Sequence, residues 1–125
     1  IITAEFSNEM PLVQISRDQM KQVIINLILN SFDAMRDTGG GEVKLTTEFR
    51  EGVVVIAVRD NGSGIPEFVQ DNIFDLYFTT KDTGGGIGLA ISDKIVEAHE
   101  GKLYFDTETD VGTTFYIELP TSKIV

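Results

Sequence analysis

A polar stripe on an otherwise apolar helical segment constrains the possible folds of this chain more than any other feature of its sequence. At about 3.6 residues per turn, Asn26, Asn30 and Asp33 fall on one narrow face of a predicted helix, and Gln22 lies beside them. Most of the remaining helix surface is apolar and consists of Met20, Val23, Ile24, Leu27, Ile28 and Met35. Burying an unpaired amide-like group costs roughly 2–7 kcal/mol. The stripe therefore needs a polar partner, either another part of the protein or a bound polar ligand.

The composition is that of one globular domain. The chain has 125 residues, 42% of them hydrophobic, which supports one core but not two ordinary domains. It contains no Cys, so disulfides and thiolate metal sites are excluded, as suits a reducing compartment. No apolar run reaches the roughly 18 residues of a membrane span, and we expect no secretory leader. We expect a single cytoplasmic domain over residues 1–125, cut from a longer parent that is either free or membrane-anchored.

The net charge of −10 restricts the partners of this domain. Such a surface repels phosphodiester backbones and anionic lipids, so we expect no nucleic-acid binding and no direct membrane contact. A bound polyphosphate would have to be held locally, by a helix N-terminus, by one or two cations and by a metal ion. The alternative is that the acidity serves solubility alone.

The periodicity of the sequence predicts strands, a helix, strands, a helix and strands, in that order. Strand patterns cover residues 3–6, 12–15, 43–49, 53–58, 103–105 and 113–119, and helix patterns cover residues 18–36 and 88–99. We expect Asp18 to cap the first helix, Gly101 to cap the second, and Pro66 to open a short helix. The nearly continuous apolar run over residues 53–58 is typical of a central strand. This order favours an α/β (α+β) two-layer sandwich, with a mixed β-sheet and helices on one face.

A candidate base-recognition site follows the apolar strand directly. Asp60 is followed by Asn61, Gly62, Ser63 and Gly64. A carboxylate at a strand end can accept a hydrogen bond from the exocyclic amine of adenine, and the two glycines would let the backbone approach the ring. Asp-Asn-Gly is also a common turn, so a turn without a ligand is the alternative for this segment.

A second candidate site lies in the glycine-rich segment Gly84-Gly85-Gly86-Ile87-Gly88-Leu89, which opens the second helix. Successive backbone N–H groups at a helix N-terminus, together with the helix dipole, form an anion site. Lys81 would add a point charge for a phosphate. The segment is neither a Walker loop nor a Rossmann fingerprint, and a flexible linker is the alternative. The segment overlaps the end of residues 70–86, a stretch whose weak periodicity is typical of a functional loop or lid.

The asparagine stripe supplies hard oxygen ligands. An Asn carbonyl suits Mg²⁺, which keeps several waters and takes few protein ligands beside substrate phosphates. Asn30 is the best candidate for the metal, with Asn26 orienting a water or a phosphate oxygen and Asp33 reaching the ribose or phosphate region. The alternative is a polar network between the helix and the sheet.

His99 is the only histidine and stands near the end of the second helix. A phosphoacceptor would need exposure and a neighbouring acid, but the adjacent Glu100 points away from it on a helix. We expect instead a favourable placement at the helix C-terminus. The aromatic side chains of Phe74, Tyr77 and Phe78 are expected to belong to the core or to anchor the lid.

Five motifs, taken in their order and spacing, resemble the catalytic, ATP-binding domain of bacterial two-component sensor histidine kinases. This domain belongs to a wider superfamily that includes gyrase, Hsp90 and MutL. Residues 26–34 look like its N box, residues 60–65 like its first glycine box and residues 73–81 like its F box. Residues 84–90 resemble the second glycine box, and residues 112–115 the terminal glycine-threonine segment. The Thr-Thr-Lys that ends the F box favours the sensor kinases over other members of the superfamily.

The resemblance implies a Bergerat ATP-binding fold, with a lid over residues 71–86 and the cofactors ATP and Mg²⁺ between the helices. Asp60 would recognise adenine with support from Thr113, Asn30 would hold Mg²⁺, and Asn26 and Lys81 would be the catalytic residues. The nucleotide-binding set implied by the resemblance comprises Asn26, Asn30, Asp33, Asp60, Gly62, Gly64, Ile65, Thr80, Lys81, Gly84, Gly85, Gly86, Ile87, Gly88, Leu89 and Thr113.

Three positions depart from the usual pattern of these kinases. Gly85 stands where Thr or Ser is frequent, which removes a hydroxyl contact to phosphate. Glu100 takes the place of the first glycine of the usual His-Gly-Gly, and Asp110 replaces a frequent glycine before Gly112, so both are expected to affect turns. The chain itself holds no dimerisation helix with a phosphoacceptor histidine, so we expect that histidine on another domain.

Together these features predict a kinase domain that transfers the γ-phosphoryl group of Mg-ATP to a histidine on a dimerisation domain. That domain would belong to the same or a paired polypeptide, and a response regulator would be an indirect partner. No general base is expected among the residues of this chain, because phosphoryl transfer depends mainly on positioning and charge neutralisation. The main alternative is another ATPase of the superfamily or an anti-sigma-factor serine kinase. A third is a nucleotide-binding module without catalysis.

Overall fold

The strands form one mixed sheet. The computed structural model describes residues 2–5, 15–36, 41–75 and 88–121. Within these residues the strands are β1 (Ile2–Glu5), β2 (Val43–Arg50), β3 (Val53–Asp60), β4 (Lys102–Glu108) and β5 (Gly112–Pro120), in the spatial order β1-β2-β3-β5-β4. β1 runs parallel to β2, and each other neighbouring pair is antiparallel. The central position of β3 confirms the expectation from its apolar run.

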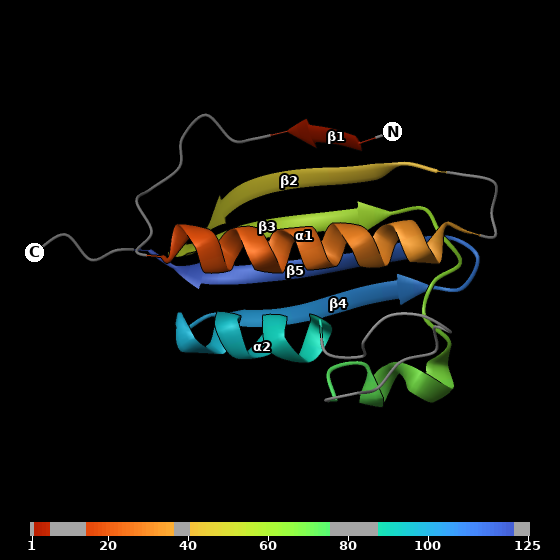
Figure 1. The fold of residues 1–125 in the computed structure, drawn as a ribbon. Coiled ribbons are helices and arrows are strands. Elements are labelled where there is room, and N and C mark those ends of the chain that lie inside the picture. Colours follow the sequence, from red (N-terminus) through yellow and green to blue (C-terminus); the bar gives the residue numbers. More distant parts are fainter. Residues whose placement is uncertain (1, 6–14, 37–40, 76–87, 122–125) are drawn as a thin grey trace, which may run out of the picture.

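The two α-helices, α1 (Arg17–Ala34) and α2 (Gly88–Ala98), lie on the same face of the sheet, as Figure 1 shows. α1 packs on β2 and β3, α2 packs on β4, and the two helices contact each other. A short 3₁₀ helix, η2 (Glu67–Asn72), follows the end of β3. This arrangement confirms the predicted two-layer sandwich. None of the described helices is both long and apolar enough to cross a membrane.

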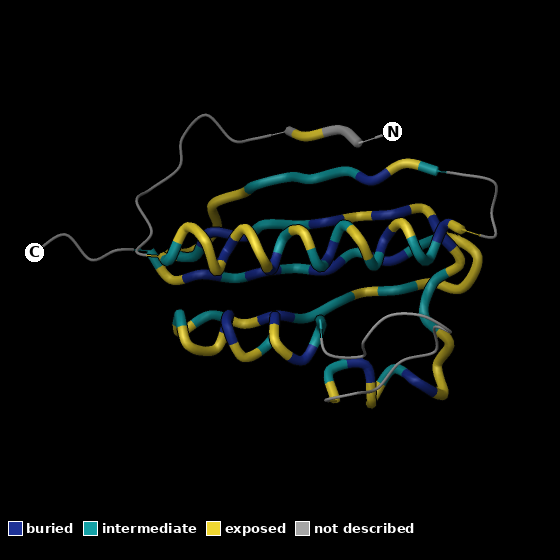
Figure 2. Tube along the Cα trace, in the orientation of Figure 1, coloured by how far each residue is buried: buried dark blue, intermediate teal, exposed yellow. Residues whose placement is uncertain are grey.

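The core fills the space between the sheet and the two helices. Leu27 of α1, Val58 of β3, Val96 of α2 and Ile117 of β5 are fully buried there. In Figure 2 the turns of α1 alternate between buried and exposed positions, as expected for a helix that covers a sheet on one side. The prediction that Val43 and Phe49 of β2 share a buried face is confirmed for Val43, which is fully buried. It is wrong for Phe49, which is 46% exposed beside the β2–β3 turn.

Ser16, and not Asp18, caps α1. Its backbone is extended, and its hydroxyl accepts a hydrogen bond from the N–H of Gln19 at 3.4 Å. Asp18 lies in the first turn, where its charge still suits the positive end of the helix dipole. The predicted N-cap was therefore wrong by two residues, because Ser and Asp are both favoured at helix N-caps. Pro66 similarly precedes η2 as its cap and does not open it.

α2 ends in a Schellman motif that places Glu100 in the left-handed region. The N–H of Gly101 donates to the carbonyl of Val96 and the N–H of Glu100 to that of Glu97, both at 2.9 Å, and Glu100 has φ 61°. The prediction of Gly101 as the cap was therefore wrong. Glycine is needed at position 101 because β5 approaches the backbone closely there, and a Cβ would collide with the carbonyl oxygen of Glu118.

The N-terminal part of the chain follows the strand prediction only in its first segment. The expected strand over residues 3–6 corresponds to β1, with residue 6 outside the described residues. Of the expected strand over residues 12–15, only Ile15 is described, and it is not in a strand.

Candidate functional site

Asp60 is a buried carboxylate that the backbone holds through one of its two oxygens. It ends β3 and is 4% exposed. Its Oδ1 accepts hydrogen bonds from the N–H of Gly62 at 2.9 Å and from the N–H of Thr113 at 3.3 Å. Thr113 is the register partner of Asp60 on β5, so it contacts the carboxylate through its backbone and not through its hydroxyl. Because both bonds fall on Oδ1, the other oxygen, Oδ2, is the atom that a ligand would meet.

Thr107 connects the segments around Asp60 and was missed from the sequence. Its hydroxyl lies 2.8 Å from that of Thr113, and its Oγ1 accepts a hydrogen bond from the N–H of Ile65 at 2.9 Å. Thr107 therefore joins β4 to β5 and to the loop after β3. A signal was available, because Leu103, Phe105 and Thr107 alternate along one strand and the polar residue continues the inward-facing series.

The two glycines after Asp60 are needed for close packing within the protein. A Cβ on Gly62 would lie 2.7 Å from the carbonyl oxygen of Ala34, at the end of α1. Gly64 has φ 80°, and a Cβ there would lie 2.6 Å from the carbonyl oxygen of Glu108. These contacts explain both glycines without a ligand. An approach of the same backbone to a purine ring remains a prediction.

Asn26 joins α1 to the N-terminal end of α2. Its side-chain Nδ2 donates to the carbonyl of Gly88 at 3.5 Å and to the hydroxyl of Ser92 at 3.3 Å. Ser92 is fully buried, and this bond explains why a serine stands among the apolar buried residues of α2. Since these two bonds use both N–H groups of the amide, the carbonyl oxygen Oδ1 of Asn26 is its remaining polar atom.

The candidate residues follow one another along α1. The N–H of Ser63 donates to the carbonyl of Ala34 at 3.2 Å, which brings the turn after Asp60 against the C-terminal end of this helix. Asn30 lies one helical turn before Ala34, and Asn26 lies one turn before Asn30, beside Gly88. The buried carboxylate, the half-buried Asn30 and the start of α2 therefore border the same stretch of helix.

Asp33 forms an ion pair with a residue just after the end of α1. Its Oδ1 lies 2.6 Å from the Nη2 of Arg36, in an ion pair between residues three positions apart. The polar stripe is thus divided: Asn26 contacts α2, Asp33 contacts Arg36, and Asn30 lies between them. The two bonds of the Asn26 side chain run to α2 and not to the sheet.

Part of the predicted site lies outside the described residues. This part comprises Thr80, Lys81, Gly84, Gly85, Gly86 and Ile87, together with Tyr77 and Phe78. Of the predicted lid over residues 71–86, residues 71–75 are described. Phe74 packs against Phe105 and Phe115, with ring centroids 6.0 and 6.5 Å apart, so it belongs to the core. Ile65 and Leu89 are half-buried and pack against the core as well.

His99 forms a second connection between the helices, at the end opposite Asn26. Its Nε2 accepts a hydrogen bond from the N–H of Ser16 at 2.9 Å, and its Nδ1 lies 2.8 Å from the carbonyl of Ile95. A backbone N–H can only donate, so Nε2 is the acceptor in the bond from Ser16. His99 directly follows the last residue of α2, so it lies at the helix C-terminus as expected.

Residues 15–123 match the family described as "Histidine kinase-, DNA gyrase B-, and HSP90-like ATPase". The sensory histidine kinase/phosphatase NtrB of Rhizobium leguminosarum bv. phaseoli is 35% identical over 136 residues, which cover 98% of this chain and 35% of that protein. The sensor protein FixL of Bradyrhizobium diazoefficiens is 39% identical over 112 residues, which cover 89% and 22%. The chain belongs to this ATPase family, and it spans about a third or less of the length of these two relatives.

Solved structures narrow the class within the family. The nucleotide-free catalytic domain of histidine kinase ThkA superposes with a TM-score of 0.82 at 36% identity, covering 96% of this chain and 78% of that one. Full-length ShkA in complex with AMPPNP gives a TM-score of 0.86 at 26% identity, covering 99% and 26%. This chain therefore has the fold of the catalytic domain of sensor histidine kinases, as its five motifs predicted.

Proposed function

We propose that this chain binds Mg-ATP between α1 and α2 and, within a longer cytoplasmic or membrane-anchored protein, phosphorylates a histidine on a dimerisation domain. The observation that supports the proposal most is Asp60. Asp60 is only 4% exposed, and burying a carboxylate is costly unless polar groups of the protein or of a ligand interact with it. Its Oδ2 is free of the backbone bonds that hold Oδ1, and it would accept a hydrogen bond from the exocyclic amine of adenine.

The other end of the site suits phosphates. α2 begins at Gly88, and the positive end of its dipole favours anions. Asn30 would supply a carbonyl ligand to Mg²⁺, and Lys81 with the amides of residues 84–88 would contact the phosphates. The remaining acceptor atom of Asn26, Oδ1, would hold a metal-bound water, since its N–H groups are already used by Gly88 and Ser92. Asp33 would reach the ribose or phosphate region.

The reaction proposed is a single phosphoryl transfer. The bond between the β-phosphate oxygen and the γ-phosphorus of ATP breaks, and a bond forms from that phosphorus to an imidazole nitrogen of the acceptor. ADP leaves and the imidazole loses a proton. Mg²⁺ would neutralise the charge on the phosphates, and this chain would position the nucleotide, so that no side chain acts as a base. A response regulator would then accept the group from the histidine.

Replacing Asp60 with Asn tests the base-recognition part of the proposal. Loss of a charge-assisted hydrogen bond is expected to cost about 1.5–3 kcal/mol, which corresponds to a Kd for ATP roughly 10- to 150-fold weaker in titration calorimetry. Affinity for inorganic tripolyphosphate should be unchanged. Asp106→Asn, at an exposed position of the edge strand β4, is the matched control. Equal weakening of both ligands would show that Asp60 does not recognise the base.

Transfer is tested by adding a purified dimerisation domain from a related sensor kinase and labelled ATP. A histidine kinase gives an acid-labile, alkali-stable phosphoprotein, whereas a serine kinase gives an acid-stable product. ATP binding that survives both EDTA and Asn30→Ala, with no labelling of the acceptor, would instead favour a nucleotide-binding module without catalysis.

A further inference from the structure

A polar row crosses one end of the sheet face that the helices cover. Asp60 of β3 is the register partner of Thr113 of β5, and Thr113 is in turn the register partner of Thr107 of β4. Residues of one row project from the same face of a sheet, since side chains alternate along each strand. The next two rows of these strands on this face are Val58, Phe115 and Phe105, then Ile56, Ile117 and Leu103. The polar row therefore ends an otherwise apolar face of the three strands.

Thr107 has three hydrogen-bonding neighbours within the protein. Its Oγ1 accepts a hydrogen bond from the N–H of Ile65 at 2.9 Å and lies 3.3 Å from the carbonyl oxygen of Gly112, to which it can donate. The hydroxyl of Thr113 lies closer, at 2.8 Å, which is the usual length of an O–H···O hydrogen bond. Either hydroxyl can be the donor in this contact, and in both cases Thr107 fixes the direction in which the hydroxyl of Thr113 points.

Thr113 is held on two sides. Its backbone N–H donates to the Oδ1 of Asp60 at 3.3 Å, and its hydroxyl contacts Thr107 on the neighbouring strand. It is 3% exposed, so water has little access to its hydroxyl. The orientation of this buried hydroxyl beside the carboxylate therefore depends on Thr107.

Thr107 also holds the loop that follows Asp60. Ile65 in this loop is half-buried and packs against the core. Its N–H donates to Thr107, and its carbonyl accepts a hydrogen bond from the Nε2 of Gln70 at 2.9 Å, so side chains hold both of its backbone polar groups. Through one hydroxyl, the position of Ile65 is linked to that of Thr113.

We propose that Thr107 is a positioning residue for recognition of the purine base, an inference that rests on the proposed function. Its hydroxyl orients that of Thr113 beside the carboxylate of Asp60 and keeps Ile65 in place, without itself contacting the nucleotide. The surface that meets the base is thereby set before binding, which lowers the cost of ordering these groups when the ligand arrives. Loss of the Thr107 hydroxyl should therefore weaken binding of the base and leave binding of the phosphate chain unchanged.

Thr107→Val tests this role, because Val keeps the branched shape of Thr but has no hydroxyl. In titration calorimetry with Mg²⁺ its Kd for ATP should rise by about two- to tenfold, and its Kd for inorganic tripolyphosphate should not change. Thr107→Ser keeps the hydroxyl and should bind ATP as the wild type does.

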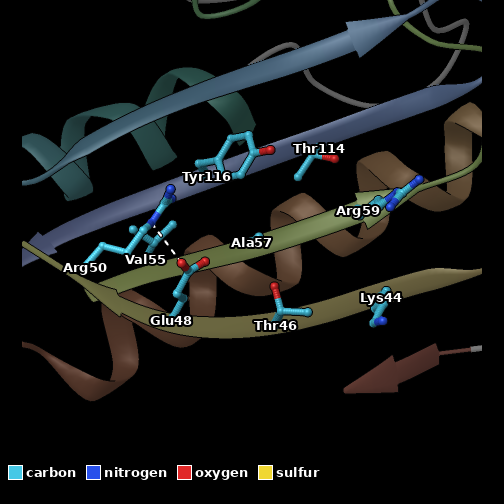
Figure 3. Close-up of a pocket in the computed structure, with 9 residues that line it drawn as sticks. All are labelled: Lys44, Thr46, Glu48, Arg50, Val55, Ala57, Arg59, Thr114 and Tyr116. Carbon is cyan, nitrogen blue, oxygen red and sulfur yellow. Dashed lines mark ion pairs between the residues drawn. The ribbon is translucent and has the colours of Figure 1, made fainter. Parts of the chain in front are cut away.

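Thr114→Val is the matched control. Thr114 follows Thr113 on β5 and therefore projects from the opposite face of the sheet, where Figure 3 shows it lining a shallow hollow in front of the helices. The same loss of a hydroxyl at this position should leave the affinity for ATP unchanged.

A double substitution separates positioning through Thr113 from a general effect on the fold. In Thr113→Val the hydroxyl that Thr107 orients is missing, so adding Thr107→Val should weaken ATP binding by a smaller factor than it does in the wild type. Equal factors in the two backgrounds would overturn the inference, because independent effects add.

Other outcomes distinguish failure of this inference from failure of the proposed function. Unchanged ATP affinity of Thr107→Val, equal weakening of ATP and tripolyphosphate, or binding by Thr107→Ser as weak as that by Thr107→Val would overturn the inference alone. No binding of ATP by the wild type would overturn the proposed function, and this inference with it. Urea unfolding verifies that Thr107→Val is folded. If it is not, Thr107→Cys, whose thiol is only a weak donor and acceptor, replaces it and should weaken ATP binding in the same direction.

Discussion

Replacing Glu100 with glycine is expected to stabilise this domain by about 1 kcal/mol. Glu100 has φ 61°, and a residue with a Cβ pays roughly 1–2 kcal/mol in that region. Glycine removes this penalty but gives the unfolded chain more freedom, which offsets roughly 0.5–1 kcal/mol. Glu100 also places a negative charge at the C-terminal end of α2, and its removal contributes a further ~0.3–1 kcal/mol. The sum of these terms is near 1 kcal/mol in favour of glycine.

Urea and thermal unfolding measure this difference. For a domain of this size, about 1 kcal/mol corresponds to a rise in Tm of roughly 4 °C. Glu100→Gln and Glu100→Ala remove the charge but keep a Cβ, so they should recover only the smaller, electrostatic part. If Glu100→Gly were no more stable than Glu100→Ala, the left-handed backbone would not be the source of the penalty and the reasoning would be refuted.

Three further substitutions address other parts of the molecule. Burial, and after it the charge of nearby Glu97, raise the pKa of Asp93 above its ordinary value of 3.8. Asp93 therefore contributes stability below pH 3.8, and this contribution is lost as pH rises through the pKa of the folded state. Compared with the wild type, Asp93→Asn should unfold at a higher urea concentration at pH 7 but not at pH 3. Burial, and after it Glu118, raise the pKa of Tyr104 above its ordinary value of 10.0, so the stability of the fold should fall as pH rises above 10.0. In urea unfolding between pH 9 and 11, Tyr104→Phe should remove this part of the dependence of stability on pH. His99→Phe leaves the N–H of Ser16 without its acceptor and should cost about 1–3 kcal/mol in urea unfolding, whereas wild-type stability in this variant would remove His99 from the account of helix pairing.

The sequence predicted the elements well where one face of a segment is buried. In β5 every second residue is buried, and the apolar run of β3 includes the neighbouring buried residues Val54 and Val55, whereas burial in β2 decreases toward Phe49. The caps were less predictable, because they depend on one local hydrogen bond. Ser16 and Asp18 are both good N-cap residues, and only the geometry of the first turn decides between them.

The candidate site was predictable as a set of residues but not as a set of contacts. Asp60, Asn26 and Asn30 stand out because polar groups interrupt apolar segments. Their partners are remote in sequence: Asn26 reaches Ser92, and Asp60 reaches Thr113. A pattern of period two or 3.6 contains no information on such pairs, since they arise only when helices and strands pack. His99 shows the same limit, because its bond partner Ser16 lies 83 residues away in the sequence.

The hydrogen bonds of Asn26 and His99 between α1 and α2 have a mechanical consequence. Asn26 ties the helices at the start of α2 and His99 ties them at its end, about 16 Å apart for a helix of 11 residues. Hydrogen bonds at both ends oppose separation of the two helices, so splaying them at either end would require breaking a hydrogen bond. The part of α1 between Ser16 and Asn26 is therefore expected to move together with α2.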